Sequence, residues 1–211
     1  MLGFKRKLKL IAITDKKLKP DIIKSVEDAL RGGATSVQLR LKESPTKEMV
    51  DLGLRIRRLT RDYDALYFVD DRLDVALATD ADGVQLGPDD MPIAKARELA
   101  PNLIIGGSVY SLKEALMAER EGAHFLGAGS VFPTPSKSGV RVIGIDGLKE
   151  IVESVRIPVV AIGGINKDNV VDVLHTGVVG IAVISAIMGA EDVYKATLEL
   201  RRIVDEVLKD E

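Results

Sequence analysis

The sequence predicts an α/β fold, a single (β/α)8 barrel that spans residues 1–211. Short apolar runs rich in β-branched residues alternate with longer amphipathic stretches along the whole chain. Most runs are apolar on both faces, as are strands of a parallel sheet covered by helices. No Gly/Ser-rich linker interrupts them, and the expected strands are Leu8–Thr14, Ser36–Leu41, Ala65–Asp70, Gly83–Leu86, Leu103–Val109, His124–Ser130, Pro158–Ile162 and Gly180–Ile184.

The helices between these strands follow from polar starts and apolar residues at three- and four-residue spacing, as in Pro45–Tyr63 and Ser111–Glu121. A weak repeat of a turn followed by an apolar strand recurs at every second strand-and-helix unit. Alternate strands of one barrel are expected to be alike in this way, so the repeat favours closure into a barrel. An open doubly wound sheet is the competing fold. It is disfavoured because no glycine-rich dinucleotide loop follows the first strand, where Thr14 and Asp15 stand instead.

Composition excludes several classes of protein. The chain has no cysteine, so disulfides, thiolate metal sites and a cysteine nucleophile are ruled out. With only two histidines, a metal ion would need oxygen ligands. A net charge of −2 and the absence of tryptophan argue against nucleic acid as a partner. No apolar run is long enough for a membrane span or a signal peptide, so we expect a cytoplasmic protein.

Polar side chains follow the second expected strand. Alternation places Gln38, Arg40 and Lys42 on one face and apolar residues on the other. The apolar face must meet the helices, so the polar three are expected to point into the barrel at its carboxyl end, where active sites of such barrels lie. Two cations and an amide there suit a phosphate or diphosphate.

Carboxylates follow the third and fourth strands. Asp70 and Asp71 end one strand, and Asp90 lies in the loop after the next. Beside a cationic strand, such a set fits magnesium bridging a diphosphate. The alternative is that Asp71 and Asp90 cap the helices that follow them.

The last two strands end in turns that suit an anion. Gly163 and Gly164 follow the seventh strand, and Ile184 and Ser185 the eighth, where barrels often bind phosphate with loop amides. Tight-turn glycines are the alternative. The loop Phe132–Gly139 after the sixth strand carries hydroxyls and a lysine and is a further candidate for phosphate binding or closure.

The assembled motifs resemble the thiamine phosphate synthase family. The resemblance runs from Ile13 to Ser185 and depends on the segments VQLRLK, VDDRLDVALATDADGVQLGPDD, GGSVYS, GAGSVFPTPSK, VVAIGGI and GIAVIS. Each is short, but six in the right order at strand ends are specific. Members of that family are (β/α)8 barrels that join a hydroxymethylpyrimidine diphosphate to a thiazole phosphate with magnesium and release pyrophosphate.

The resemblance also implies site residues, which include the strand-end candidates above. The pyrimidine diphosphate would contact Gln38, Leu39, Arg40, Leu41, Lys42, Asp70, Ser108 and Lys137, and of these Arg40, Lys42, Ser108 and Lys137 would be catalytic. The thiazole phosphate would contact Thr134, Pro135, Ser136, Gly164, Ile184 and Ser185. One Mg²⁺ per subunit would bind Asp71 and Asp90. Four positions depart from the family pattern, with Asp70 for asparagine, Gln85 for histidine, Pro88 for glutamine and Ser136 for threonine.

The function expected from this resemblance is that of a transferase, thiamine phosphate synthase, which forms thiamine phosphate by magnesium-assisted ionisation of the diphosphate. Its partners would be small-molecule substrates, with no nucleic acid and no membrane, and a homo-oligomer stays open. Two alternatives remain, a thiazole tautomerase-like isomerase that uses a histidine after the sixth strand, and a non-catalytic phosphate-binding barrel. The residues Gly129, Ser130 and Val131 after that strand, and the presence of Asp71 and Asp90, favour the synthase.

Overall fold

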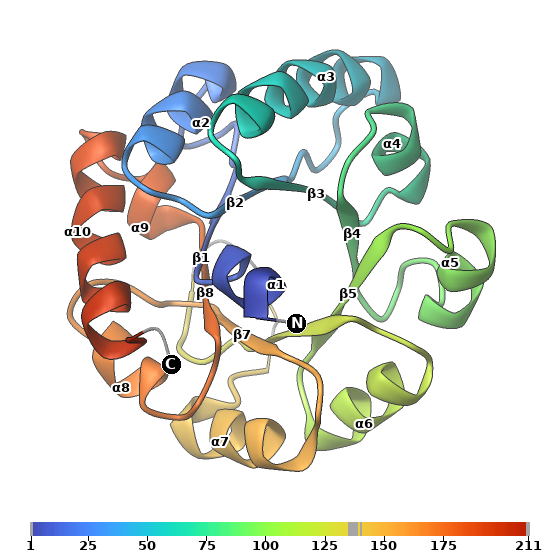
Figure 1. Ribbon diagram of the computed structural model, residues 1–211, viewed down its shortest axis with the longest axis vertical. Helices are drawn as coiled ribbons and strands as arrows, with labels where there is room; N and C mark the ends of the chain where they lie inside the picture. The colour runs from blue at the N-terminus through green and yellow to red at the C-terminus, as the bar shows by residue number, and fades with distance from the viewer. Residues whose placement is uncertain (1, 135–138, 140, 210–211) are drawn as a thin grey trace.

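The computed structural model describes residues 2–134, 139 and 141–209. Eight parallel strands in sequential order form a closed barrel, which confirms the predicted fold. Figure 1 shows the ring of strands inside a ring of helices. The strands are β1 Leu10–Ile13, β2 Ser36–Leu39, β3 Leu66–Asp70, β4 Gly83–Leu86, β5 Ile104–Val109, β6 Phe125–Ala128, β7 Val159–Ile162 and β8 Gly180–Val183.

Helices follow the strands around the outside of the barrel. They are α2 Ile22–Arg31, α3 Thr46–Asp62, α4 Leu73–Ala78, α5 Ile93–Leu99, α6 Leu112–Arg120, α7 Gly144–Ser154, α8 Val170–Leu174, α9 Ser185–Met188 and α10 Val193–Val207. Side-chain caps define several starts. For example, Asp21 accepts a hydrogen bond from Lys24 N, and Ser111 from Glu114 N. The two helices predicted from spacing appear as α3 and α6, within one residue at each end.

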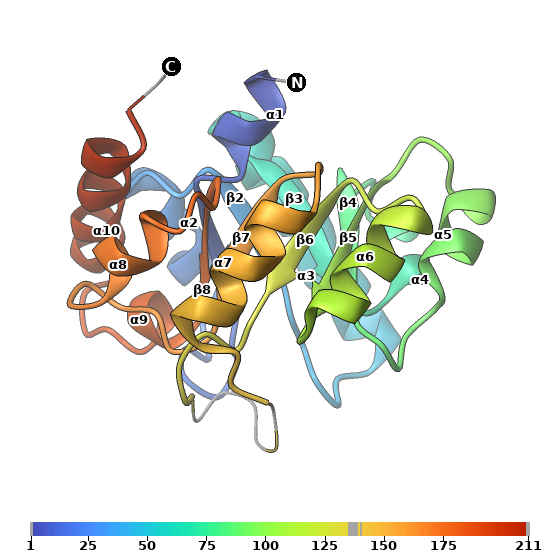
Figure 2. The ribbon, with the colours of Figure 1, turned by 90° about the horizontal axis from the view of Figure 1, so that it is seen from below.

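The first helix, α1 (Leu2–Lys7), lies across the amino-terminal end of the barrel. Figure 2 shows it at the end opposite the long loop between β6 and α7. Its Phe4 ring packs edge-on against Phe125, with 6.1 Å between centroids, and Phe125 packs against Phe68 at 5.3 Å. These rings fill the interior at the amino end, so the space inside the barrel opens only at the carboxyl end.

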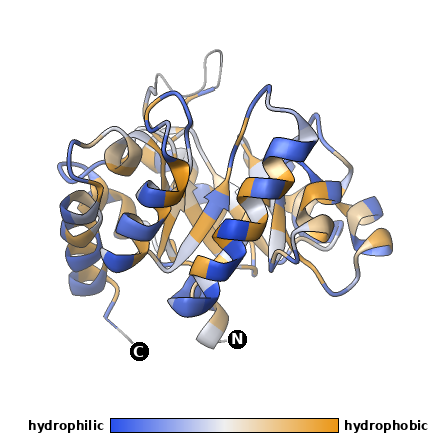
Figure 3. Cartoon of the chain, turned by 90° about the horizontal axis from the view of Figure 1, so that it is seen from above, coloured by the Kyte–Doolittle hydropathy of each residue, from blue (hydrophilic) through white to orange (hydrophobic). Residues whose placement is uncertain are grey.

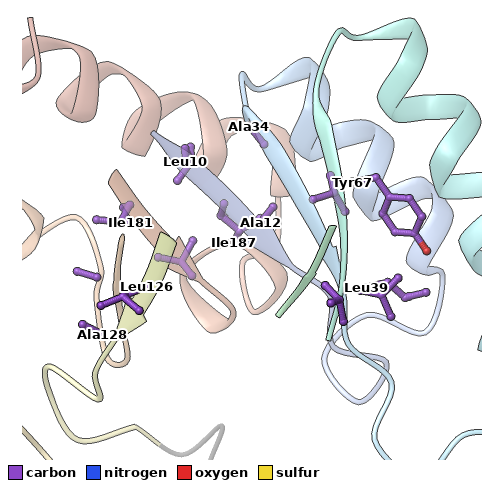
Figure 4. Close-up of a cluster of buried hydrophobic side chains, with 14 of the residues drawn as sticks. Leu10, Ala12, Ala34, Leu39, Tyr67, Leu126, Ala128, Ile181 and Ile187 are labelled. Carbon is purple, nitrogen blue, oxygen red and sulfur yellow. The ribbon is translucent and has the colours of Figure 1, made fainter. Parts of the chain in front are cut away.

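Two apolar layers result from strands that are apolar on both faces. The larger layer lies between strands and helices, and Figure 4 shows part of it, with Leu10 and Ala12 of β1. The smaller layer lies inside the barrel and includes Ile11 and Ile13, the alternate residues of that strand. Figure 3 shows that hydrophobic residues alternate with hydrophilic ones along the helices that cover the barrel.

The predicted second strand, Ser36–Leu41, is longer than β2, which ends at Leu39. The backbone of Arg40 leaves the ladder because it bonds to a side chain. Arg40 N donates to Thr14 Oγ1 at 2.9 Å, and Thr14 Oγ1 donates to the Arg40 carbonyl at 3.2 Å. Within the part of the chain that the structure describes, no helix is long and apolar enough to cross a membrane.

The interior layer provides a stability test. Phe68 is fully buried against Phe125, so Phe68→Ala leaves a cavity inside the closed barrel. We expect a loss of about 3–5 kcal/mol in the free energy of unfolding, measured by denaturant titration. Exposed Leu77→Ala on α4 is the control and should cost well under half of that. Equal losses for both variants would contradict the assignment of this layer as core.

Candidate active site

The carboxyl ends of the strands surround a cavity of about 550 Å³. Every strand of the barrel contributes to its wall. Its floor is apolar except for Gln85, with Phe125, Val160 and Ala182 among the lining residues, and its rim is polar. The cavity brings together the predicted residues Gln38, Arg40, Lys42, Asp70, Asp71, Asp90, Ser108, Thr134, Gly164, Ile184 and Ser185.

Three predicted residues, Pro135, Ser136 and Lys137, lie outside the described residues. Two others, Leu39 and Leu41, belong to the apolar layer beneath the helices, and their side chains are buried there. Any contact of Leu39 or Leu41 with a ligand would therefore come from the backbone. This follows from the alternation that turns Gln38, Arg40 and Lys42 inward.

Asp70 is the centre of the charged wall. Its Oδ1 accepts a hydrogen bond from Gln38 Nε2 at 2.7 Å, and its Oδ2 lies 3.8 Å from both Arg40 Nε and Lys42 Nζ. Burial, and then the negative charge of Asp71, raise the pKa of Asp70 to about 6 despite these cations. Arg40 also lies 3.5 Å from Asp15, a residue that strand-end reasoning missed.

Asp71 and Asp90 face each other across the rim. Asp71 has a left-handed backbone (φ 64°), which aspartate tolerates, and its amide donates to the Gln85 carbonyl at 2.8 Å. Lys42 contacts Asp71. Burial, and then Asp71, raise the pKa of Asp90. Burial alone would lower the pKa of Lys42, but its bond to Asp71 and the charges of Asp70 and Asp71 raise it.

The capping alternative for these two carboxylates is not what the structure shows. Arg72 occupies the N-cap position of α4 and Pro92 that of α5. Neither helix start is capped by a side-chain hydrogen bond. Asp90 instead accepts a hydrogen bond from Gly87 N at 2.7 Å inside its own loop. Asp71 and Asp90 therefore keep carboxylate oxygens for another partner.

A divalent cation fits this pair. Among the described residues there is no group of three or more histidine, cysteine or carboxylate side chains placed to hold a metal ion. Mg²⁺ does not need one, since it is commonly bound by one or two carboxylates together with substrate phosphates and water. The negative charge of Asp71 disfavours ionisation of Asp90, and a bound cation would offset that repulsion.

The glycines after β7 are required by packing. A Cβ on Gly164 would lie 2.7 Å from Phe132 Cβ and from the Pro133 carbonyl, and one on Gly163 would overlap Ser130. Both have positive φ, 100° and 67° in chain order. Glycine is therefore required at both positions by the tight turn, as the alternative interpretation predicts. The two residues still line the cavity, as Ile184 and Ser185 do.

Several cavity residues were not predicted. Glu114 and Tyr110 line the wall, but Glu114 serves the start of α6, where its Oε2 accepts from Tyr110 N at 2.6 Å. Arg141 is a further cation on the rim, in a loop without a periodic pattern. Gln85 departs from the family pattern, and its place in the fourth expected strand predicts an inward-facing side chain that is either a ligand or a core amide; it lines the cavity and donates to Ser108 Oγ at 3.0 Å.

These features define a (β/α)8 barrel with a cavity suited to phosphorylated ligands. The chain belongs to the thiamine monophosphate synthase family, whose model matches residues 10–187. The predicted family is thereby confirmed.

Named relatives agree over the whole chain. A thiamine-phosphate synthase of Pyrococcus furiosus is 68% identical over 207 residues, covering 98% of this chain and all of the relative. One of Methanococcus maripaludis is 52% identical over 208 residues, covering 99% of this chain and all of the relative. These relatives confirm the predicted function, thiamine phosphate synthesis, and the predicted class, a transferase that releases pyrophosphate. The family is also consistent with a catalytic metal and small-molecule substrates.

Solved structures agree on the fold. The structure of thiamine phosphate pyrophosphorylase from Pyrococcus furiosus matches with a TM-score of 0.94 and 68% identity, covering 97% of this chain and 99% of that one. A 3-hexulose-6-phosphate synthase matches with a TM-score of 0.65 at 22% identity, covering 92% and 99%, and shares the fold alone.

The raised pKa of Asp70 gives a stability prediction. A buried carboxyl with a raised pKa holds its proton more tightly in the folded state, so its stabilising contribution is present near pH 4 and is lost as the pH rises through about 6. We expect Asp70→Asn to become progressively more stable than the parent protein over this range, measured by urea unfolding in EDTA.

Asp74 offers a control of opposite sign. Its hydrogen bond to Arg72 lowers the pKa of that carboxyl, so the contribution of Asp74 is lost as the pH falls. Asp74→Asn should therefore lose stability relative to the parent as the pH rises toward 3.8, and the difference should stay constant between pH 4 and 6. A pH-independent difference for Asp70→Asn would contradict the burial of an ionised carboxylate at that position.

Proposed function

We propose that the cavity condenses 4-amino-2-methyl-5-(diphosphooxymethyl)pyrimidine with a thiazole phosphate, giving thiamine phosphate and pyrophosphate. The observation that carries this proposal is the meeting, at one rim, of the cations Arg40 and Lys42 with the carboxylate pair Asp71 and Asp90. Cations alone would suit any phosphate. Cations with two partly buried carboxylates suit a diphosphate that arrives with a divalent metal ion.

The diphosphate half of the site would be the wall built by β2 to β5. Arg40 and Lys42 would bind the diphosphate oxygens, and the raised pKa of Lys42 keeps its ammonium charged at neutral pH. We assign Mg²⁺ to Asp71 and Asp90, where it would add positive charge to the departing pyrophosphate. Lys42, whose side chain is 47% exposed, would exchange its contact with Asp71 for a phosphate oxygen of the bound diphosphate.

The reaction needs ionisation and positioning more than proton transfer. The bond between the pyrimidine methylene carbon and the diphosphate oxygen breaks, and its electron pair leaves with pyrophosphate. The electron-rich aminopyrimidine carries the resulting positive charge, and the thiazole nitrogen then attacks that carbon. Neither step needs a base from the protein. The apolar floor, with Phe125 and Val160, would keep water from that carbon.

The thiazole phosphate would lie on the side built by β6 to β8. Thr134, Gly164, Ile184 and Ser185 line the cavity there, and the hydroxyl groups of Thr134 and Ser185 are candidate donors to a phosphate. Pro135, Ser136 and Lys137 complete the predicted set.

The tautomerase alternative is less well supported by the cavity wall. Among the described lining residues there is no histidine, and the chain's two histidines lie elsewhere, His124 before β6 and His175 at the end of α8. His124 accepts a hydrogen bond from Ile105 N at 2.9 Å, a structural role. The test is one incubation with both substrates and Mg²⁺, with thiamine phosphate read by mass spectrometry. Isomerised thiazole without condensation would favour the isomerase, and no turnover would favour a binding protein.

Loss of either metal carboxylate should abolish most activity. We expect Asp71→Ala and Asp90→Ala each to lower kcat by about 10²–10⁴-fold while the circular dichroism spectrum stays that of the folded parent. Asp74→Ala, an exposed carboxylate on α4, is the matched control and should keep its activity. Full turnover of an Asp71 or Asp90 variant in the presence of a chelator would refute the metal assignment.

Lys137 tests the loop after β6. Lys137 is the one lysine in a loop segment rich in hydroxyl groups, and we expect its ammonium group to bind the departing pyrophosphate. Lys137→Ala should lower kcat and weaken binding of the pyrimidine diphosphate more than of the thiazole phosphate, measured by steady-state kinetics with each substrate varied. Lys149→Ala on the outer helix α7 is the control. Unchanged kinetics for Lys137→Ala would assign that lysine to the solvated surface.

A further inference from the structure

The floor of the cavity holds a buried polar side chain to which the mechanism above assigns no task. Gln85 lies on β4 and is only 5% exposed. Its neighbours Val84 and Leu86 belong to the layer under the helices, so Gln85 faces the interior of the barrel. In the strand register it lies opposite Asp70 on β3 and Gly106 on β5.

Two glycines make room for this side chain. A Cβ on Gly106 would overlap Gln85 Oε1, and one on Gly127 would lie 3.0 Å from Gln85 Nε2. Any other residue at position 106 would expel the amide from its present place. The positions on β5 and β6 that face the interior are therefore kept small where Gln85 reaches across them.

The hydrogen bonds of the amide are incomplete. Its Nε2 donates to Ser108 Oγ at 3.0 Å, while Oε1 is buried without a hydrogen-bond partner among the described residues. A buried acceptor without a partner destabilises the folded state relative to an apolar group of the same shape. A group that is unfavourable for folding and lies in a functional cavity suggests a role in function.

We propose that Gln85 is a positioning residue that makes Ser108 a hydrogen-bond donor to the diphosphate of the substrate. A hydroxyl has one proton to donate. Because the Gln85 amide N–H is itself a donor, it takes a lone pair of Ser108 Oγ, and the hydroxyl proton must point elsewhere. Ser108 lines the cavity, so that proton is available to a ligand there. This inference rests on the function proposed above.

The position of Ser108 selects the diphosphate as the acceptor. Leu86 pairs with Gly107, so Ser108 follows at the level of Gly87, whose amide is bound by Asp90. The hydroxyl thus lies beside the loop that carries one predicted metal ligand. A donor at this place forms a stronger hydrogen bond as negative charge grows on the leaving pyrophosphate, so its effect should fall on kcat.

A double-mutant cycle tests the proposal. Ser108→Ala removes the donor, and we expect kcat to fall by about 10²-fold. Gln85→Met removes the amide at similar size, leaves the hydroxyl free to turn, and should lower kcat by about tenfold. The double variant should be no slower than Ser108→Ala within about threefold, because Gln85 acts only through Ser108. Multiplied losses in the double variant would overturn the proposal.

Two further arms separate positioning from packing. Gln85→Met removes an unpaired buried oxygen, so the ligand-free Tm should equal or exceed that of the parent. A lower Tm together with multiplied losses means a structural role and overturns the proposal. Gln85→Asn provides a second cycle, since its shorter side chain withdraws the donor without introducing an apolar group, and the same absence of further loss is expected.

Gln38→Met is the matched control. Gln38 is also 5% exposed in the cavity wall, but its amide bonds to Asp70. Its loss should multiply with that of Ser108→Ala, and its Tm should fall because Asp70 loses a donor. If Gln38→Met also shows no further loss in the Ser108→Ala background, the coupling is not specific to Gln85 and the proposal is overturned.

The identity of the acceptor is tested with inorganic pyrophosphate and Mg²⁺. Gln85→Met and Ser108→Ala should each weaken product inhibition by pyrophosphate about tenfold. Unchanged inhibition would place the acceptor on the pyrimidine ring and overturn the assignment to the diphosphate. Failure of the proposed function is distinguishable, because the parent protein would then form no thiamine phosphate in the assay that precedes the cycle.

Discussion

The closed parallel register of the eight strands decides which side chains reach the inside of the barrel. Alternate residues of each strand face inward, and the aromatic layer of Phe68 and Phe125 with α1 fills the amino-terminal half. Polar side chains that face inward can therefore gather only toward the carboxyl end. Asp70 and Gln85 are opposite each other in this register. The pairing of β3 with β4 therefore fixes the position of the charged wall relative to the Gln85 amide.

The charged wall holds more carboxylates than cations before any ligand arrives. Arg40 and Lys42 lie among Asp15, Asp70 and Asp71, so neither cation is buried without a counterion. Burial, and then the negative charge of Asp71, raise the pKa of both Asp70 and Asp90, so the charged form of these carboxyl groups is disfavoured. A divalent cation would reduce the repulsion among these carboxylates, and the diphosphate that arrives with it would give Arg40 and Lys42 phosphate oxygens to bind.

The fold and the rim could be predicted because they depend on periodicity. Apolar runs on both faces define the strands, and alternation alone turns Gln38, Arg40 and Lys42 inward. The contact of Gln85 with Ser108 could not be predicted in this way, since it depends on glycines at 106 and 127 and on the stagger between strands. Leu39 and Leu41 entered the predicted site through the family resemblance, whereas alternation alone already places their side chains under the helices, where the structure has them.

Gly164 lies at the carboxyl end of β7, where ligands of such barrels bind, but glycine is required there by packing. Its missing Cβ leaves space for the backbone at Phe132 and Pro133, so the turn after β7 packs directly on the loop after β6. Phe132 N also donates to the Gly163 carbonyl at 3.0 Å, which ties the two loops together. A side chain at position 164 would push these loops apart before it reached any phosphate, and binding of the thiazole phosphate would weaken because Thr134, two residues beyond Phe132, would move. Loss of binding on substitution of Gly164 is thus evidence for loop packing, and direct phosphate contact is better examined at the hydroxyls of Thr134 and Ser185.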